Sequence, residues 1–160
     1  MKTLHRLEDL FLVTLFLAAL LALTAQLGSR YFLSYQFSWT EELARFLFTW
    51  IVFLGAANVM RHSGLIAVRL IPDRLPDGPR NIVAIFMHLL GGVFFAILTW
   101  VGIQLCLKVA ALPTIAMGIS STFEYGAVPA GGALMAVRSF GAALGIWRDG
   151  LPRDTAETLM

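Results

Sequence analysis

Charged side chains are scarce in this sequence: they make up 14% of its 160 residues, whereas 58% are hydrophobic. Soluble domains carry about a quarter charged residues, so we expect lipid rather than water to surround most of the chain. The single cysteine, Cys106, excludes an intrachain disulfide. The Lys and Arg residues are scattered between apolar stretches, and this distribution argues against nucleic-acid binding.

Catalytic and metal-binding motifs are also missing from the sequence. The three histidines, His5, His62 and His88, lack metal-ligand spacing, and no phosphate-binding loop or nucleophile elbow occurs. Asn58, His88 and Gln104 are isolated in apolar stretches, which favours hydrogen bonds between helices over an ion pathway. We therefore predict no catalytic, cofactor-binding or metal-binding residue, and no enzyme activity.

Four apolar stretches are long enough, or nearly so, to cross a bilayer core of about 20 helical residues. Because backbone amides cannot stay unpaired in hydrocarbon, each stretch must be helical. The sequence predicts an all-α integral membrane protein with one domain over 1–160, and spans at about 10–28, 43–60, 82–107 and 125–147. Between the second and third spans, 65–75 suits a short amphipathic helix in the membrane interface.

The first residues could be mistaken for a signal peptide, because Lys2 and Arg6 precede an apolar run. However, Glu8 and Asp9 interrupt it, and the run at 10–28 exceeds the roughly 7–15 residues of a signal core. We expect a retained membrane helix; the alternative is a cleaved signal.

Orientation follows from the distribution of positive charge. With the N-terminus inside, nine Lys and Arg residues lie on the inner side and three on the outer side, namely Arg30, Arg45 and Lys108. This bias predicts that both termini are cytoplasmic, and that the loops at 29–40 and 108–124 face outward.

The second span begins with a cluster of polar and charged residues. Ser38 and Glu41 have the spacing of a capping box, although Thr40 is a second candidate for the cap. Arg45 lies four residues after Glu41 and three after Glu42, so it can pair with either carboxylate on one helical face. Two interpretations stay open: this pair fixes the helix against a partner protein, or it is an interfacial ion pair that ends the span.

Arg138 is the other charged residue within an expected span. Either its side chain snorkels to the inner surface, or the helix ends near it and 139–147 lies along the interface.

Small residues recur four positions apart, the spacing that lets membrane helices approach closely. The pairs are Ala18/Ala22, Gly92/Ala96, Ala127/Gly131, Gly132/Ala136 and Gly141/Gly145. They predict tight helix packing, but they leave open whether the partner is this chain or another.

These residues resemble a known family. The pattern W-x-E-E-L-A-R, followed by an apolar run and a basic loop, is similar to the small, DctQ-like permease subunit of TRAP (tripartite ATP-independent periplasmic) transporters. It consists here of Trp39, Glu41, Glu42, Leu43, Ala44, Arg45, Trp50, Gly55 and Arg61. The resemblance continues through 62–76 and around Pro129. It departs at Gly131 and Gly132, where bulkier residues are common in the family.

The resemblance implies a multi-pass subunit of the bacterial inner membrane. It would pack against a large permease subunit that takes up an organic acid or related solute, driven by an ion gradient and delivered by a periplasmic binding protein. Trp39, Glu41, Glu42, Arg45, Trp50, Gly55 and Arg138 would have structural or interface roles. Arg30, Tyr35, Gln36 and Lys108 would face the binding protein.

Two alternatives stay open at this point. One is the small subunit of a tripartite tricarboxylate transporter, which has a similar size and topology. The other is a stand-alone small membrane enzyme or channel.

Overall fold

The computed structural model describes residues 2–32, 38–62 and 77–150. They form the helices α1 (Lys2–Phe32), α2 (Ser38–His62), α4 (Asp77–Val109), α5 (Thr122–Tyr125) and α6 (Ala127–Asp149). The interfacial helix expected at 65–75 lies outside the described residues, as do Tyr35 and Gln36.

Four segments of the described chain are long and apolar enough to cross a membrane. They are Arg6–Tyr31, Ser38–Met60, Pro79–Val109 and Thr122–Asp149. The expected all-α class with four membrane spans is therefore confirmed. The third of these segments has 31 residues, about 46 Å at the rise of an α-helix. Since this length exceeds a hydrocarbon core of about 30 Å, α4 must tilt or project from the bilayer.

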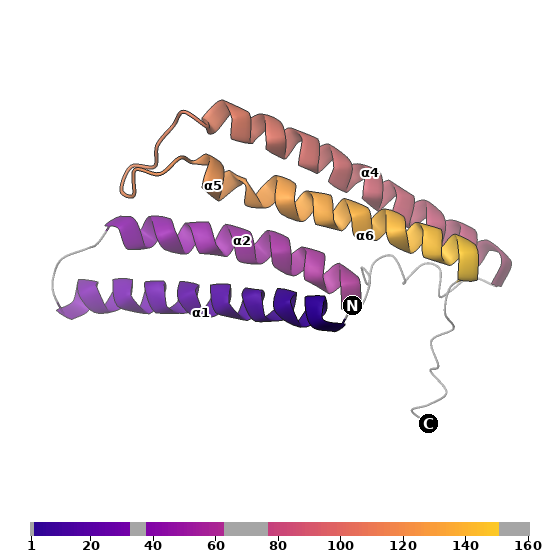
Figure 1. Ribbon diagram of the computed structural model, residues 1–160, viewed down its shortest axis with the longest axis horizontal. Coiled ribbons are helices and arrows are strands. Elements are labelled where there is room, and N and C mark those ends of the chain that lie inside the picture. Colours follow the sequence, from indigo (N-terminus) through magenta and orange to yellow (C-terminus); the bar gives the residue numbers. More distant parts are fainter. Residues whose placement is uncertain (1, 33–37, 63–76, 151–160) are drawn as a thin grey trace, which may run out of the picture.

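The four long helices lie side by side in the order α1, α2, α6, α4 (Figure 1). Backbone packing among these helices joins α1 to α2, α2 to α6 and α6 to α4, and no other pair of them. The last helix in the chain therefore lies between the second and the third, where it runs in the same direction as α2. Among the described helices, a row of this kind leaves two broad faces that no other helix covers.

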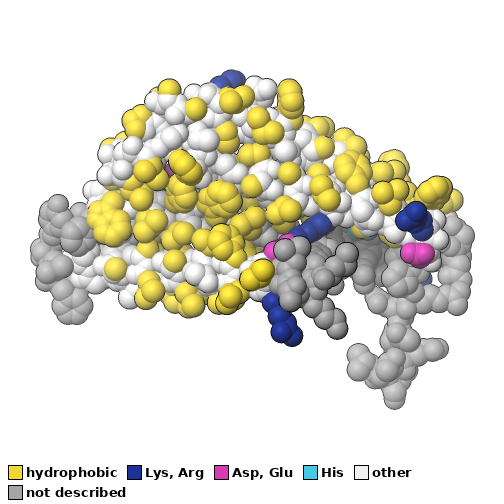
Figure 2. Space-filling view, viewed as in Figure 1, with side chains coloured by type: hydrophobic (Ala, Val, Ile, Leu, Met, Phe, Trp, Pro, Cys, Tyr) yellow, Lys and Arg dark blue, Asp and Glu magenta, His cyan; other side chains and the backbone are white. Residues whose placement is uncertain are grey.

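The interior of the row is made of small side chains. Apart from Met135 and Ile146, every buried hydrophobic residue among those described is an alanine. We compared the share of the most apolar stretch of each span that is buried inside the structure. This share is 39% in the α5–α6 segment, but only 6% in α1 and 11% in both α2 and α4. Figure 2 shows hydrophobic side chains exposed along the face in view. The packing is therefore centred on α6, and most apolar surface of the other helices faces outward.

Two neighbouring glycines of α6 set its distances to the flanking helices. A Cβ on Gly131 would lie 2.6 Å from the Cβ of Phe53 in α2, and one on Gly132 would lie 2.8 Å from Oγ1 of Thr99 in α4. Only glycine permits approaches this close. Gly131 and Gly132 are also the residues at which the sequence departs from the resembled family. Because they have no side chains, α6 fits closely between α2 and α4.

The hydroxyl of Ser139 adds a polar link between α6 and α4. It is almost completely buried and donates a 2.8 Å hydrogen bond to the carbonyl oxygen of His88. In an apolar setting, such a bond satisfies a group that would otherwise be costly to bury.

The small residues of the five pairs differ in how far they are buried within this chain. Gly92, Ala127, Gly131, Gly132 and Ala136 are buried within this chain. In contrast, Gly141 and Gly145 are exposed, and a Cβ on either would meet no atom within 4 Å.

Candidate functional sites at the two ends of α2

The loop between α4 and α5 is an ordered structure. Thr114 and Ile119 are joined by a 2.7 Å backbone hydrogen bond, and an isolated antiparallel bridge pairs Pro113 with Ser120. Gly118 lies between them with φ of 65°, a left-handed conformation that favours glycine. The side chain of Ser121 closes the base of the loop by donating to the carbonyl oxygen of Leu112 at 2.9 Å.

The N-terminal part of α2 holds this loop through the carboxylate of Glu42. The backbone amides of Ala116 and Met117 donate to its two oxygens, each at 2.9 Å. A carboxylate that accepts two consecutive amides makes charge-assisted hydrogen bonds, which are stronger than neutral ones. Glu42 therefore fixes the position of the loop relative to α2.

Arg45 and Trp50 attach the next part of the chain to the same helix. Nε of Arg45 lies 2.9 Å from a carboxylate oxygen of Glu124 in α5. The indole Nε1 of Trp50 donates to the carbonyl oxygen of Phe123 at 2.9 Å. We call Glu42, Arg45 and Trp50, together with their partners in 116–124, the loop clamp.

The expected partner of Arg45 was wrong. Spacing along α2 predicted Glu41 or Glu42, but Arg45 pairs with Glu124, and Glu42 is engaged by backbone amides. The physical reason is that the ordered loop brings its own donors and a carboxylate to this end of α2. Glu41 is exposed in the first turn of the helix.

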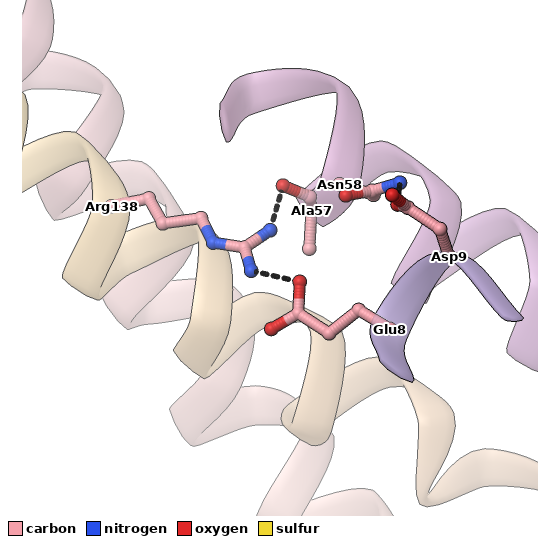
Figure 3. Close-up of polar contacts among 5 residues, drawn as sticks. All are labelled: Glu8, Asp9, Ala57, Asn58 and Arg138. Atoms are coloured by element: carbon pink, nitrogen blue, oxygen red, sulfur yellow. Dashed lines mark hydrogen bonds and ion pairs between the residues drawn. The ribbon is translucent and has the colours of Figure 1, made fainter. Parts of the chain in front are cut away.

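A second polar group lies toward the C-terminal end of α2 (Figure 3). The guanidinium of Arg138 in α6 donates through one nitrogen to the carbonyl oxygen of Ala57, and the other nitrogen lies 2.8 Å from the carboxylate of Glu8 in α1. Beside this pair, Asn58 donates to Asp9 at 2.8 Å. We call these five residues the Arg138 cluster.

The Arg138 cluster ties three helices together. Its side chains come from α1, α2 and α6, although α1 and α6 are not neighbours in the row. Arg138 retains 19% of its side-chain exposure and Glu8 retains 34%. Of the two alternatives for Arg138, the one in which the helix ends near it was wrong, since α6 continues to Asp149. The expected helix–helix hydrogen bond of Asn58 is present.

A pocket of about 250 Å³ adjoins the Arg138 cluster. Glu8, Asn58 and Arg138 supply its polar lining, and its apolar walls are Phe11, Leu12, Leu54 and Leu134. An apolar cavity of about 150 Å³ already accommodates a benzene ring, so this pocket has room for a large apolar side chain.

The remaining expected residues do not join either cluster. Arg30 and Lys108 are exposed in the last turns of α1 and α4. Trp39 is 48% exposed, and Gly55 is half-buried with open space above its Cα. No group of three or more His, Cys, Asp or Glu residues in the described ranges could hold a metal ion.

Sequence reasoning missed three carboxylates that complete the clusters, those of Glu8, Asp9 and Glu124. A signal for two of them was available: Arg45 and Arg138 lie within apolar stretches and each needs a counter-charge. Glu8 and Glu124 are carboxylates next to the first and fourth apolar stretches, and matching charges across spans would have found them.

Comparison with known proteins decides the family. The family model that describes the DctQ component of tripartite ATP-independent periplasmic transporters matches residues 10–149 of this chain. The chain belongs to this family. It is therefore a small membrane subunit of a TRAP transporter that partners a large permease, and the expected resemblance is confirmed. The tripartite tricarboxylate alternative is set aside by the same match.

Three relatives agree with this placement of the DctQ-family subunit. The sialic acid TRAP transporter small permease protein of Vibrio cholerae is 30% identical over 137 residues, which are 86% of this chain and 79% of the relative. The sialic acid TRAP transporter permease protein of Haemophilus influenzae is 30% identical over 139 residues, 86% of this chain. The isethionate TRAP transporter permease protein of Oleidesulfovibrio alaskensis is 31% identical over 139 residues, 82% of this chain.

The last two relatives are much longer than this chain. The matched region is 22% of each of them, so a unit similar to this subunit is there fused to a larger remainder. In these proteins the small and large parts of the permease are a single polypeptide.

Proposed function

We propose that this subunit is a non-catalytic scaffold. It packs against the large permease subunit in the bacterial inner membrane, and the two mediate binding-protein-dependent, ion-gradient-driven uptake of an organic acid or related solute. The observation that carries the proposal is the single row of helices: a row encloses no passage, and it exposes far more apolar surface than it buries. Exposed surface of this kind suits a broad, fixed contact with another membrane protein.

The solute class is supported by the relatives. Two of them are named for sialic acid and one for isethionate, and all of these are organic anions. The substrate and ion sites belong to the large subunit on this proposal, because the clusters in the small subunit are engaged in bonds within the chain.

We also propose that both termini are cytoplasmic. The excess of Lys and Arg on the inner segments supports this orientation, by nine residues to three. The loop clamp, Arg30 and Lys108 then lie on the periplasmic side, where a periplasmic binding protein can approach them. Reporter fusions to each end test the orientation: a periplasmic signal from either terminus would contradict it.

Reconstitution into proteoliposomes tests the function. With the binding protein, a solute and an ion gradient present, we expect uptake only when both membrane subunits are present. Vesicles that contain the small subunit alone should take up nothing. Uptake by the small subunit alone, or an unchanged rate with the large subunit alone, would overturn the scaffold role.

A further inference from the structure

We propose that the large permease subunit docks on the face of the row that carries the Arg138 pocket, and that one of its membrane helices lies along α6 over Leu134, Arg138, Gly141 and Gly145. This inference rests on the proposed function and adds the face and the residues of the contact.

The four residues form a continuous strip. They are spaced by four, three and four positions, which places them on one side of an α-helix. Leu134 and Arg138 line the pocket, and the two glycines continue the strip toward the end of α6 at Asp149. The pocket and the glycines are therefore parts of a single surface, which we call the α6 strip.

Among the described residues, nothing packs against the glycines of the α6 strip. Gly131 packs against Phe53 and Gly132 packs against Thr99, whereas a Cβ on Gly141 or Gly145 would meet no atom within 4 Å. A glycine inside a helix is unfavourable relative to alanine. In a membrane its compensation is the close approach of a second helix, and within the described residues no helix makes that approach to Gly141 or Gly145.

The pocket supplies an independent reason for a protein partner. Glu8 and Arg138 belong to segments that span the membrane, yet both side chains remain partly exposed beside the pocket. Ionisable groups within membrane spans face protein or water rather than lipid, because hydrocarbon solvates charge poorly. A partner that inserts an apolar side chain between Phe11, Leu54 and Leu134 would cover the ion pair and exclude lipid from it.

The exposed side of α2 carries an apolar strip, in contrast to the α6 strip with its charged Arg138. Phe48, Val52 and Val59 recur at helical spacing and are 65%, 46% and 57% exposed. Between them lies Ala56, an exposed small residue. This strip is apolar and includes no ionisable side chain, so it suits acyl chains. It also provides matched controls for substitutions in the α6 strip.

The partner is the large permease subunit rather than a second copy of this chain. In the relatives from Haemophilus influenzae and Oleidesulfovibrio alaskensis, the matched region is 22% of the protein, so the unit similar to this chain is covalently joined to a remainder more than three times its length. That fusion holds one small unit beside one large remainder, which favours the large permease as the occupant of an exposed face of the row.

The test is co-purification of the tagged small subunit with its co-expressed large permease subunit. We expect Gly141→Leu combined with Gly145→Leu to lower the yield of the complex on the order of tenfold, the loss that follows from obstructing a central contact. Ala56→Leu should leave the yield at the wild-type level. Helicity and membrane insertion of each variant, measured on the small subunit alone, should be unchanged.

A second measurement does not depend on disrupting the contact. With Cys106 replaced by serine, single cysteines at 141 and at 52 are labelled with a nitroxide, and collisions with lipid-soluble oxygen are measured with and without the large subunit. We expect the large subunit to protect position 141 and to leave position 52 exposed.

The outcomes separate this inference from the proposed function. If the wild-type subunit captures no large permease, both fail. If it does capture the permease, but the glycine variants bind normally and position 141 stays exposed to lipid, only the docking face is wrong. A disulfide-linked dimer of the small subunit through position 141 in the presence of the large subunit would also overturn it.

Discussion

Glu42 of α2 accepts hydrogen bonds from the consecutive backbone amides of Ala116 and Met117, at 2.9 Å each, across 74 and 75 residues of sequence. One carboxylate thus attaches the loop between α4 and α5 to a helix that precedes it by a whole membrane span. Arg45 and Trp50 continue the attachment along the same helix. This end of the molecule is held together by side chains of α2.

Glu42→Gln should loosen the loop, because the neutral amide has one acceptor oxygen in place of two and loses the charge that strengthens both bonds. Hydrogen exchange at the amides of Ala116 and Met117 should become faster, while exchange in the middle of α6 stays slow. The matched control is Glu41→Gln, since Glu41 is exposed on the same turn. Equal exchange at Ala116 and Met117 in wild type and the Glu42 variant would refute the role assigned to this carboxylate.

Trp50→Phe tests the second attachment of the loop clamp. The substitution keeps an aromatic ring but removes the donor to the carbonyl oxygen of Phe123. A neutral hydrogen bond contributes about 1 kcal/mol, so the free energy of unfolding in detergent should fall by about that amount. Trp100→Phe is the control, because Trp100 is 65% exposed on α4. A Trp50 variant no less stable than this control would count against the attachment.

Arg138→Ala should destabilise the isolated subunit more strongly, because it removes both the ion pair with Glu8 and the hydrogen bond to the carbonyl oxygen of Ala57. Breaking a largely buried pair costs about 3 kcal/mol, and the remaining exposure of both side chains lowers this to about 2 kcal/mol. Thermal unfolding in micelles measures the loss. Arg148→Ala, at an exposed position of the same helix, should have little effect.

A double-mutant cycle with Glu8→Gln separates the pair from the other contacts of Arg138. If the two groups interact, the double variant should be more stable than the sum of the single effects predicts, since both partners are then removed together. Strictly additive effects would show that the 2.8 Å contact contributes nothing to stability.

The membrane spans could be predicted from the sequence because hydropathy acts locally: a lipid-embedded segment must be apolar and helical over its own length. The order of the helices could not be predicted in this way. Ala127/Gly131 and Gly141/Gly145 have the same spacing, yet the first pair is buried within this chain and the second pair is exposed. What separates them is which helix lies opposite, and a single stretch of sequence does not contain that information.

The polar sites show the same limit. Glu42 and Arg45 were predicted as functional candidates because charge is expensive near hydrocarbon. Their partners come from residues more than seventy positions away, in a loop whose conformation depends on its own hydrogen bonds. The choice of residues was therefore accessible from the sequence, whereas the pairing was decided by tertiary structure.

The two kinds of glycine in α6 give opposite predictions for the same substitution. Gly131→Ala would place a Cβ 2.6 Å from that of Phe53 and 2.9 Å from its backbone oxygen. Because the clash includes backbone, the helices must move apart, and overpacking of this kind costs about 1–3 kcal/mol. Gly145→Ala meets no atom within 4 Å and should stabilise the isolated subunit by up to about 1 kcal/mol, because alanine is the better helix former. Thermal unfolding of both variants in detergent measures the contrast, and a Gly131 variant as stable as the Gly145 variant would contradict the close packing of α6 on α2.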